Sequence, residues 1–186
     1  MSLIELQTPR LCLRRWRDDD LPAFAALNAD PEVMRFFPGC LSREQSDALV
    51  TRIQAHFSEH GFGLWALERR DSGAFIGFTG LLQVGFEAPF APAAEIGWRL
   101  AREHWHQGLA SEAARAALTF AFEGLQLPEV VSFTVPGNLR SRALMARLGL
   151  QRDLAGDFEH PRLPEGHPLR AHVLYRLGHA EWEAAQ

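Results

Sequence analysis

Hydrophobic positions along the chain follow two spacings, and each spacing predicts a type of element. Leu49, Ile53 and Phe57 recur every four residues, between a capping-box sequence that begins at Ser42 and a terminating Gly61. This pattern is typical of a capped helix. Further helices are predicted to begin at residues 18–22 and to run over residues 109–125 and 138–148. The aspartates before Pro22 and the side chain of Asn138 supply N-cap chemistry.

Short runs of apolar and β-branched residues predict the strands. We expect strands over residues 11–16, 63–68, 75–82, 94–100, 130–135 and 171–177. A turn sequence at residues 70–73 separates the second and third runs, which therefore predict an antiparallel hairpin. Residues 95–135 read as strand, helix and strand, the pattern of a right-handed parallel crossover. The order of elements predicts one α/β domain over residues 1–186, with a sheet of mixed direction.

Composition narrows the function classes. The net charge of −4 disfavours a general electrostatic grip on nucleic acid. No apolar run approaches the length that a membrane span needs, and the first residues lack the pattern of a secretory signal. Cys12 and Cys40 are expected to be free, buried thiols. We therefore expect a cytoplasmic protein without membrane or nucleic-acid partners.

The junction between the strand at 94–100 and the helix that begins at residue 109 is the most informative segment. A strand that passes through a glycine-containing turn into a helix leaves several backbone N–H groups unpaired. The helix dipole adds partial positive charge at the same place. The junction therefore suits a phosphate or pyrophosphate group.

Several sequences, taken together, resemble the acetyl-CoA-binding motifs of the GNAT N-acetyltransferase superfamily. They are Glu95-Ile96-Gly97-Trp98, Trp105-His106-Gln107-Gly108-Leu109-Ala110-Ser111-Glu112-Ala113, and Asn138 with Ser141 before Leu148-Gly149-Leu150. Two further stretches are similar to the RimJ/RimL-like branch of that superfamily. They are Thr8-Pro9-Arg10-Leu11 with Leu13-Arg14, and the closing Leu174-Tyr175-Arg176-Leu177 with Glu181-Trp182. The likeness covers nearly the whole chain and keeps the family's order and spacing.

The resemblance implies a strongly twisted central sheet, splayed between two parallel strands, with helices on both faces. It implies that acetyl-CoA lies in this opening and receives main-chain hydrogen bonds from Trp98, Arg99 and Leu100. The pyrophosphate-binding segment that it implies consists of Trp105, His106, Gln107, Gly108, Leu109, Ala110 and Ser111. Asn138 and Ser141 match positions near the pantetheine and the thioester sulfur. His106 stands where related loops commonly carry glycine, which adopts positive φ more readily.

Acetyl transfer to an amine requires a base, because an alkylamine is mostly protonated at neutral pH. Glu95 is the candidate base, since its apolar neighbours favour a raised pKa. The alternative is a structural carboxylate paired with an arginine or a backbone N–H. Ser141 is the candidate hydrogen-bond donor to the departing sulfur, and the alternative is a helix-capping position behind Asn138. Main-chain N–H groups near Trp98 are expected to stabilise the charge that develops on the thioester oxygen.

The leading hypothesis is an acetyl-CoA-dependent N-acetyltransferase that acts on a primary amine, either a protein N-terminus or a small molecule. The amine would attack the thioester directly in a ternary complex. The alternatives are a non-catalytic acyl-CoA-binding or regulatory module on the same fold, and a structural domain without affinity for CoA. The acceptor is expected near the loops at residues 36–39, 86–90 and 160–169. The histidines lack metal-ligand spacing, so no metal is expected, and the chain is predicted to be a monomer or a homodimer.

Overall fold

In the computed structural model, which describes residues 4–185, the chain forms two compact units. The first unit contains the residues up to 82 together with residues 97–117. The second contains residues 83–96 and the residues from 118 onward. Strand β5 (Ala94–Leu100) and helix α3 (Leu109–Thr119) have residues in both units.

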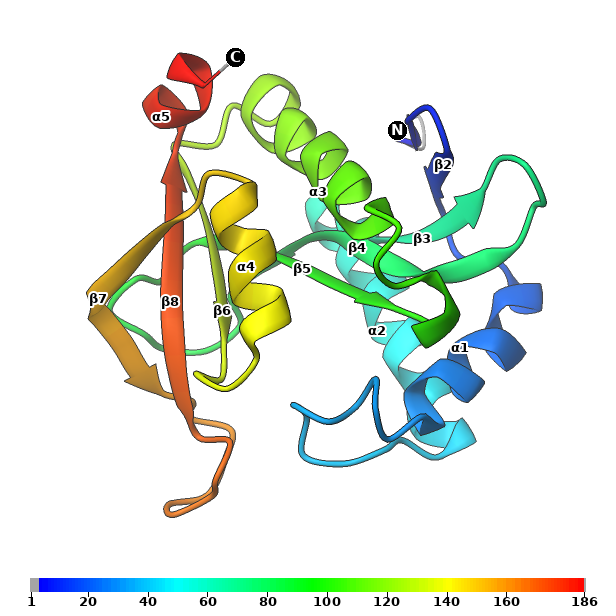
Figure 1. Cartoon of the computed structure of the whole chain (residues 1–186), viewed down its shortest axis with the longest axis horizontal. Coiled ribbons are helices and arrows are strands. Elements are labelled where there is room, and N and C mark those ends of the chain that lie inside the picture. Colours follow the sequence, from blue (N-terminus) through cyan, green and yellow to red (C-terminus); the bar gives the residue numbers. More distant parts are fainter. Residues whose placement is uncertain (1–3, 186) are drawn as a thin grey trace. The chain divides into compact units, whose positions relative to one another are not determined.

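The first unit is built on antiparallel strands covered by helices (Figure 1). The strands pair in the order β1 (Leu6–Gln7), β2 (Leu11–Arg14), β3 (Leu64–Arg69) and β4 (Phe75–Gln83). The helices α1 (Leu21–Ala29) and α2 (Arg43–His60) pack through Phe24 and Phe57 against the aromatic residues Trp16, Phe78 and Trp65. The capping box at Ser42 and the left-handed Gly61 bound α2, as its sequence predicts.

The second unit contains the parallel part of the sheet (Figure 1). Its further elements are β6 (Glu129–Thr134), α4 (Leu139–Arg147), β7 (Gln151–Glu159), β8 (Ala171–Gly178) and α5 (His179–Ala184). Strand β6 pairs in parallel with the start of β5 and antiparallel with β8, which pairs antiparallel with β7. The hydrogen-bonded order β1-β2-β3-β4-β5-β6-β8-β7 is a mixed sheet with one parallel pair, which confirms the predicted fold class.

The sequence pattern missed three elements: β1, β7 and α5. Strand β7 is mostly exposed and lacks the alternation of buried and exposed positions that identifies a strand. The α-helix predicted to reach residue 125 ends at Thr119 and continues as a π-helical turn over Phe120–Gly124. Both cysteines are free, but Cys12 is only half-buried and Cys40 is exposed, so their predicted burial is wrong.

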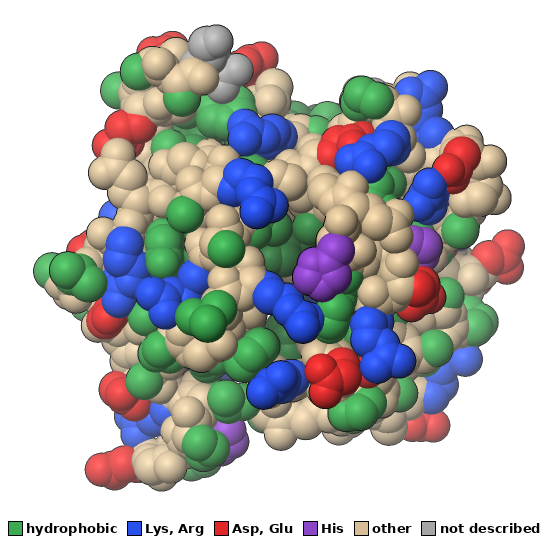
Figure 2. All heavy atoms as spheres, viewed as in Figure 1, with side chains coloured by type: hydrophobic (Ala, Val, Ile, Leu, Met, Phe, Trp, Pro, Cys, Tyr) green, Lys and Arg blue, Asp and Glu red, His purple; other side chains and the backbone are tan. Residues whose placement is uncertain are grey.

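The surface carries charges of both signs. Figure 2 shows basic and acidic side chains interspersed on the face drawn there, in keeping with the net charge of −4. Among the described residues, no helix has the length and apolar character that crossing a bilayer requires.

Asp20 was expected to cap α1, and the structure gives its carboxylate another role. The side chain makes no capping hydrogen bond to α1. Its two oxygens instead accept from Nη1 and Nη2 of the buried Arg14, both at 2.8 Å. Arg14 also donates through Nε to Glu68 at 2.6 Å. These hydrogen bonds raise the pKa of Arg14, and the ion pair joins β2 to the start of α1.

We predict that Asp20→Asn lowers the free energy of unfolding by about 3 kcal/mol, because it leaves a buried guanidinium without its bidentate partner. The matched control is Asp19→Asn, at an exposed neighbouring position, which is expected to change stability by less than about 0.5 kcal/mol. Urea unfolding of both variants measures the difference. Equal, small losses would contradict a structural role for the Arg14–Asp20 pair.

Candidate active site

The turn between β5 and α3 has an unusual backbone. A short 3₁₀ helix, Arg102–His104, follows β5, and the indole Nε1 of Trp105 donates back to the carbonyl oxygen of Leu100 at 2.8 Å. His106 and Gly108 then adopt positive φ values of 59° and 75°. A non-glycine residue with positive φ is uncommon. The turn therefore uses a left-handed conformation at the position where related loops commonly carry glycine.

This backbone leaves a row of donors without acceptors. Within the described chain, the N–H groups of residues 106–111 donate no hydrogen bond. The first paired N–H of this segment belongs to Glu112 and reaches the carbonyl oxygen of Gly108 at 3.0 Å. Unpaired N–H groups at the positive end of a helix dipole bind anions. The predicted phosphate-binding character of this turn thus has a structural basis.

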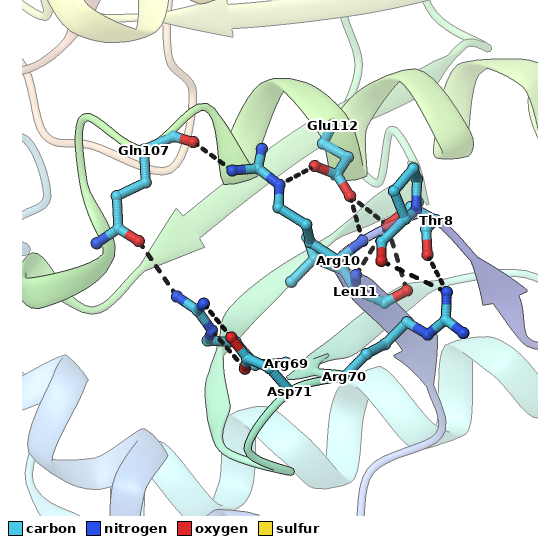
Figure 3. A network of polar contacts seen from close by, with 9 residues as sticks. Thr8, Arg10, Leu11, Arg69, Arg70, Asp71, Gln107 and Glu112 are labelled. Atoms are coloured by element: carbon cyan, nitrogen blue, oxygen red, sulfur yellow. Dashed lines mark hydrogen bonds and ion pairs between the residues drawn. The ribbon is translucent and has the colours of Figure 1, made fainter.

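A polar network in the first unit holds the turn in this shape (Figure 3). Arg10 donates to the carbonyl oxygen of Gln107 at 2.8 Å and to the Glu112 carboxylate at 2.6 Å. Thr8 donates its hydroxyl to the same carboxylate at 2.6 Å. Arg69 donates to the side-chain oxygen of Gln107 at 3.2 Å. The network fixes the turn and pairs the negative charge of Glu112, so that this charge is compensated next to an anion site.

In the second unit, β5 and β6 pair only briefly. The parallel register consists of Ala94 with Val130 and Glu95 with Val131. At the next position, the carbonyl oxygen of Ile96 accepts from the hydroxyl of Ser132 at 2.9 Å. A side chain therefore continues the contact after the backbone ladder ends. This is the local geometry of two parallel strands that begin to separate.

Glu95 lies beside an aromatic cluster. It pairs with Val131, which packs in a core group with Val84, Phe90 and Leu174. Around this group stand the aromatic residues Phe86, Phe133, Phe158, His160 and His172. Burial raises the pKa of the Glu95 carboxyl to about 8, while the charge of Arg162 acts in the opposite direction. Two of the loops expected near the acceptor, at residues 86–90 and 160–169, contribute to this cluster.

The start of α4 has Ser141 at the third helical position, behind the N-cap Asn138. The cap acceptor is Asn138, whose Oδ1 accepts from the backbone N–H of Ser141 at 3.3 Å. The amide nitrogen of Asn138 donates to Thr134 at 3.0 Å and orients the cap. Ser141 therefore serves the cap through its backbone, and its hydroxyl is not the cap acceptor. Tyr175 is buried, and its hydroxyl accepts from Arg142 at 3.3 Å.

The remaining predicted site residues lie on β5. Trp98, Arg99 and Leu100 form its end. Ala94, Ile96 and Leu100 are buried, and the other positions of the strand are half-buried. A Cβ added to Gly97 would meet nothing within 4 Å. Glycine weakens a strand, and in a strand it often marks close approach by another group. The open space beside Gly97 is therefore room that the first unit does not fill.

Sequence reasoning missed the residues that shape the site from elsewhere in the chain. Arg10 is 102 residues from Glu112, and Asn28 is 71 residues from Arg99, to which it is hydrogen-bonded. The Thr8-Pro9-Arg10 sequence was a usable signal for the first pair. No local pattern indicated the second.

The protein is a mixed α/β protein with one parallel strand pair and a helix whose first N–H groups are unpaired, an arrangement suited to an anion. The sequence profile of the acetyltransferase (GNAT) domain matches residues 10–151. The chain is 33% identical over 147 residues to the uncharacterized protein YkkB of Bacillus subtilis. The aligned region covers 78% of this chain and 84% of YkkB. It is 32% identical over 167 residues to the FsC-acetyl coenzyme A-N(2)-transacetylase of Aspergillus fumigatus, with 84% of this chain and 68% of that protein covered.

A solved structure is similar to this chain in both sequence and fold. The acetyltransferase of Agrobacterium tumefaciens is 30% identical, with 95% of each chain covered and a TM-score of 0.75. The chain belongs to the GNAT acetyltransferase family. The reaction of this family is acetyl transfer from acetyl-CoA to an amine.

We predict that His106→Gly changes the free energy of unfolding by less than about 1 kcal/mol, because relief at φ 59° offsets the greater entropy of the unfolded chain. His106→Val is expected to lower it by about 1–2 kcal/mol, since a β-branched residue fits this conformation poorly. His106→Val is also expected to weaken acetyl-CoA binding in titration calorimetry, because the neighbouring N–H groups are reoriented.

Gln126 provides the control for this pair. It has a similar φ of 54° and lies outside the turn. Gln126→Val is expected to lose comparable stability and to keep the acetyl-CoA affinity. Equal loss of affinity in both valine variants would show that instability, rather than the shape of the turn, weakens binding.

Proposed function

We propose that this protein is an acetyl-CoA-dependent N-acetyltransferase of primary amines, in which the amine attacks the thioester directly in a ternary complex. The observation that carries the proposal is the row of unpaired N–H groups at residues 106–111, held by the Arg10 network. Family membership supplies the reaction class.

The residues of the turn fit a pyrophosphate. The N–H groups are available, Gly108 has the left-handed backbone that a tight anion loop uses, and the Glu112 carboxylate is paired with Arg10. The main chain from Trp98 to Leu100 would hydrogen-bond the pantetheine. Acetyl-CoA supplies the activated acetyl group, and the protein supplies binding, orientation and proton transfer.

Glu95 would accept the proton from the amine, directly or through a water molecule. A pKa of about 8 makes the carboxylate a stronger base than an ordinary glutamate, and about a tenth of it is ionised at pH 7. Burial causes the shift, and the same burial would limit competing access by water.

Ser141 would donate a hydrogen bond to the departing sulfur, with Asn138 fixing the first turn of α4. Because Asn138 already provides the cap acceptor, the Ser141 hydroxyl is not needed for capping. Main-chain N–H groups of β5 would stabilise the negative charge that develops on the thioester oxygen.

The acceptor belongs to one of two classes, a protein N-terminus or a small-molecule amine. The Thr8–Arg14 and Leu174–Leu177 sequences support placement in the RimJ/RimL-like branch. We further propose that the enzyme works in the cytoplasm as a monomer or homodimer.

A panel of amines and peptides, assayed for acetyl-CoA-dependent thiol release, tests the proposal. Acetyl-CoA binding without turnover of any amine would instead favour a non-catalytic acyl-CoA-binding module.

For Glu95 we predict that kcat/KM rises with pH and levels off above about pH 8, because the base works in its ionised form. Glu95→Gln is expected to lower kcat by about 10²-fold to 10⁴-fold and to leave acetyl-CoA affinity within about twofold. Stability supplies an independent readout, since ionising a buried carboxyl opposes folding.

The ordinary pKa of 4.5 lies below the folded value, so the folded state binds more protons between pH 4.5 and 8 and wild-type stability falls as pH rises through this window. Relative to the wild type, Glu95→Gln is therefore expected to gain about 4–5 kcal/mol at pH 8.5 and nothing at pH 4. A pH-independent difference would contradict the raised pKa.

For Ser141 we predict that Ser141→Ala lowers kcat by about tenfold and changes stability by less than about 0.5 kcal/mol, because the backbone N–H that serves the cap is retained. The contrasting variant is Asn138→Ala, which removes the cap acceptor and is expected to cost about 1 kcal/mol. Steady-state kinetics and thermal unfolding separate the two. Unchanged kcat in Ser141→Ala would remove Ser141 from the mechanism.

A further inference from the structure

Arg99 in the first unit has a half-buried side chain whose buried Nε has incomplete hydrogen bonding. Its Nη1 donates to Oδ1 of the fully buried Asn28 in α1, at 2.6 Å. Asn28 in turn donates through Nδ2 to the Ser46 hydroxyl in α2, at 2.9 Å. Because a guanidinium only donates, this chain of bonds fixes the Asn28 oxygen toward Arg99. The guanidinium is thus held in place by side chains of two helices.

Aromatic rings lie over the guanidinium of Arg99 but accept no hydrogen bonds from its N–H groups. Its central carbon lies 4.1 Å from the ring centroid of Phe37 and 5.3 Å from that of Phe78. Rings stabilise a cation through their faces, but they accept no in-plane hydrogen bond. The Nε of Arg99 is buried and has no hydrogen-bond partner. Phe37 is 38% exposed, so one wall of this position reaches the surface of the first unit.

No acidic side chain of the described residues forms an ion pair with Arg99. Asp30, just beyond the end of α1, lies 3.7 Å from Arg102 instead. Burial alone lowers the pKa of Arg99, to about 10. Arg14 in the same unit is the instructive contrast, because Asp20 and Glu68 compensate its buried charge. A buried donor of a charged group without a partner is costly, so the unpaired Nε of this uncompensated guanidinium indicates a missing anion.

We propose that Arg99 binds a carboxylate of the acceptor, so that the acceptor is an amine that also carries a carboxylate, such as an amino acid or a short peptide acid. This inference rests on the proposed acetyltransferase function. A carboxylate matches the planar edge of a guanidinium. A single arginine between aromatic rings suits a monoanion better than a phosphate dianion. The pyrophosphate of acetyl-CoA has its own donors at residues 106–111.

The direct test is NMR of the arginine Nε–H resonances in the CoA-bound protein. Amino acids and dipeptides are titrated in matched pairs, each acid against its C-terminal amide. The Nε–H resonance of Arg99, identified by its loss in Arg99→Met, is expected to shift with acids and not with amides. The resonance of Arg102 serves as the internal control. The inference is overturned if no acid shifts the Arg99 resonance, or if the amides shift it equally.

Acetyl transfer to the same pairs gives the second readout. The wild type is expected to favour an acid over its amide by at least tenfold in kcat/KM. Arg99→Met is expected to bring this ratio close to one through KM, whereas the exposed-site variant Arg102→Gln keeps it. The acid-to-amide ratio of the wild type does not depend on the folding of any variant, and equal use of the two contradicts the inference.

The two claims fail in different ways. If acids shift the Arg99 resonance but no amine is acetylated, the carboxylate site stands and the proposed function fails. If acids and amides are acetylated equally and the resonance does not move, the function stands and the carboxylate site is wrong.

Discussion

The backbone N–H groups of residues 106–111 are the constraint on which the site depends. Backbone donors are strong and nearly always find a partner, so a consecutive run without protein acceptors is informative. His106 and Gly108 have left-handed conformations, and the Arg10, Glu112 and Gln107 contacts hold them there. The turn is therefore shaped before any ligand binds. Preorganisation of this kind lowers the cost of binding.

Arg14 and Arg99 of the first unit show how the same residue type serves different purposes. Arg14 meets carboxylates from Asp20 and Glu68, and its role is to join β2 to the start of α1. Arg99 meets an amide oxygen and two rings, and one of its donors is left over. The two differ in charge compensation, and Arg99 is also the less buried of the two. Charge compensation distinguishes an arginine that stabilises the fold from one that is suited to bind a ligand.

Much of the fold could be predicted because its signals are local. Helix α2 begins after the capping box at Ser42 and ends at the left-handed Gly61, as the sequence predicts. The apolar run at residues 94–100 likewise forms β5. Strand β7 could not be predicted, because its polar residues are mostly exposed and its pairing with β8 is decided by tertiary contacts. The predicted capping role of Asp20 was wrong because of a tertiary contact as well. Its carboxylate accepts hydrogen bonds from Arg14 and not from the N-terminus of α1.

The candidate site, too, contains residues with local sequence signals and residues that are positioned by long-range contacts. Glu95, Asn138 and the turn at 105–111 stand out in the sequence because their spacing and composition are local properties. The supports of the site are distant in sequence, as the Arg10–Glu112 and Asn28–Arg99 contacts show. A long-range pair of polar residues leaves no periodic pattern to read. Only the folded structure shows which buried charge has a partner.

The most direct measurement is an amide NMR titration with CoA, compared with 3′,5′-ADP, which lacks the pyrophosphate, and with pantetheine. The account predicts that CoA moves the backbone N–H resonances of residues 106–111 strongly downfield, as expected for new hydrogen bonds, and that the two fragments do not. Tight CoA binding that leaves those six resonances unmoved would contradict it.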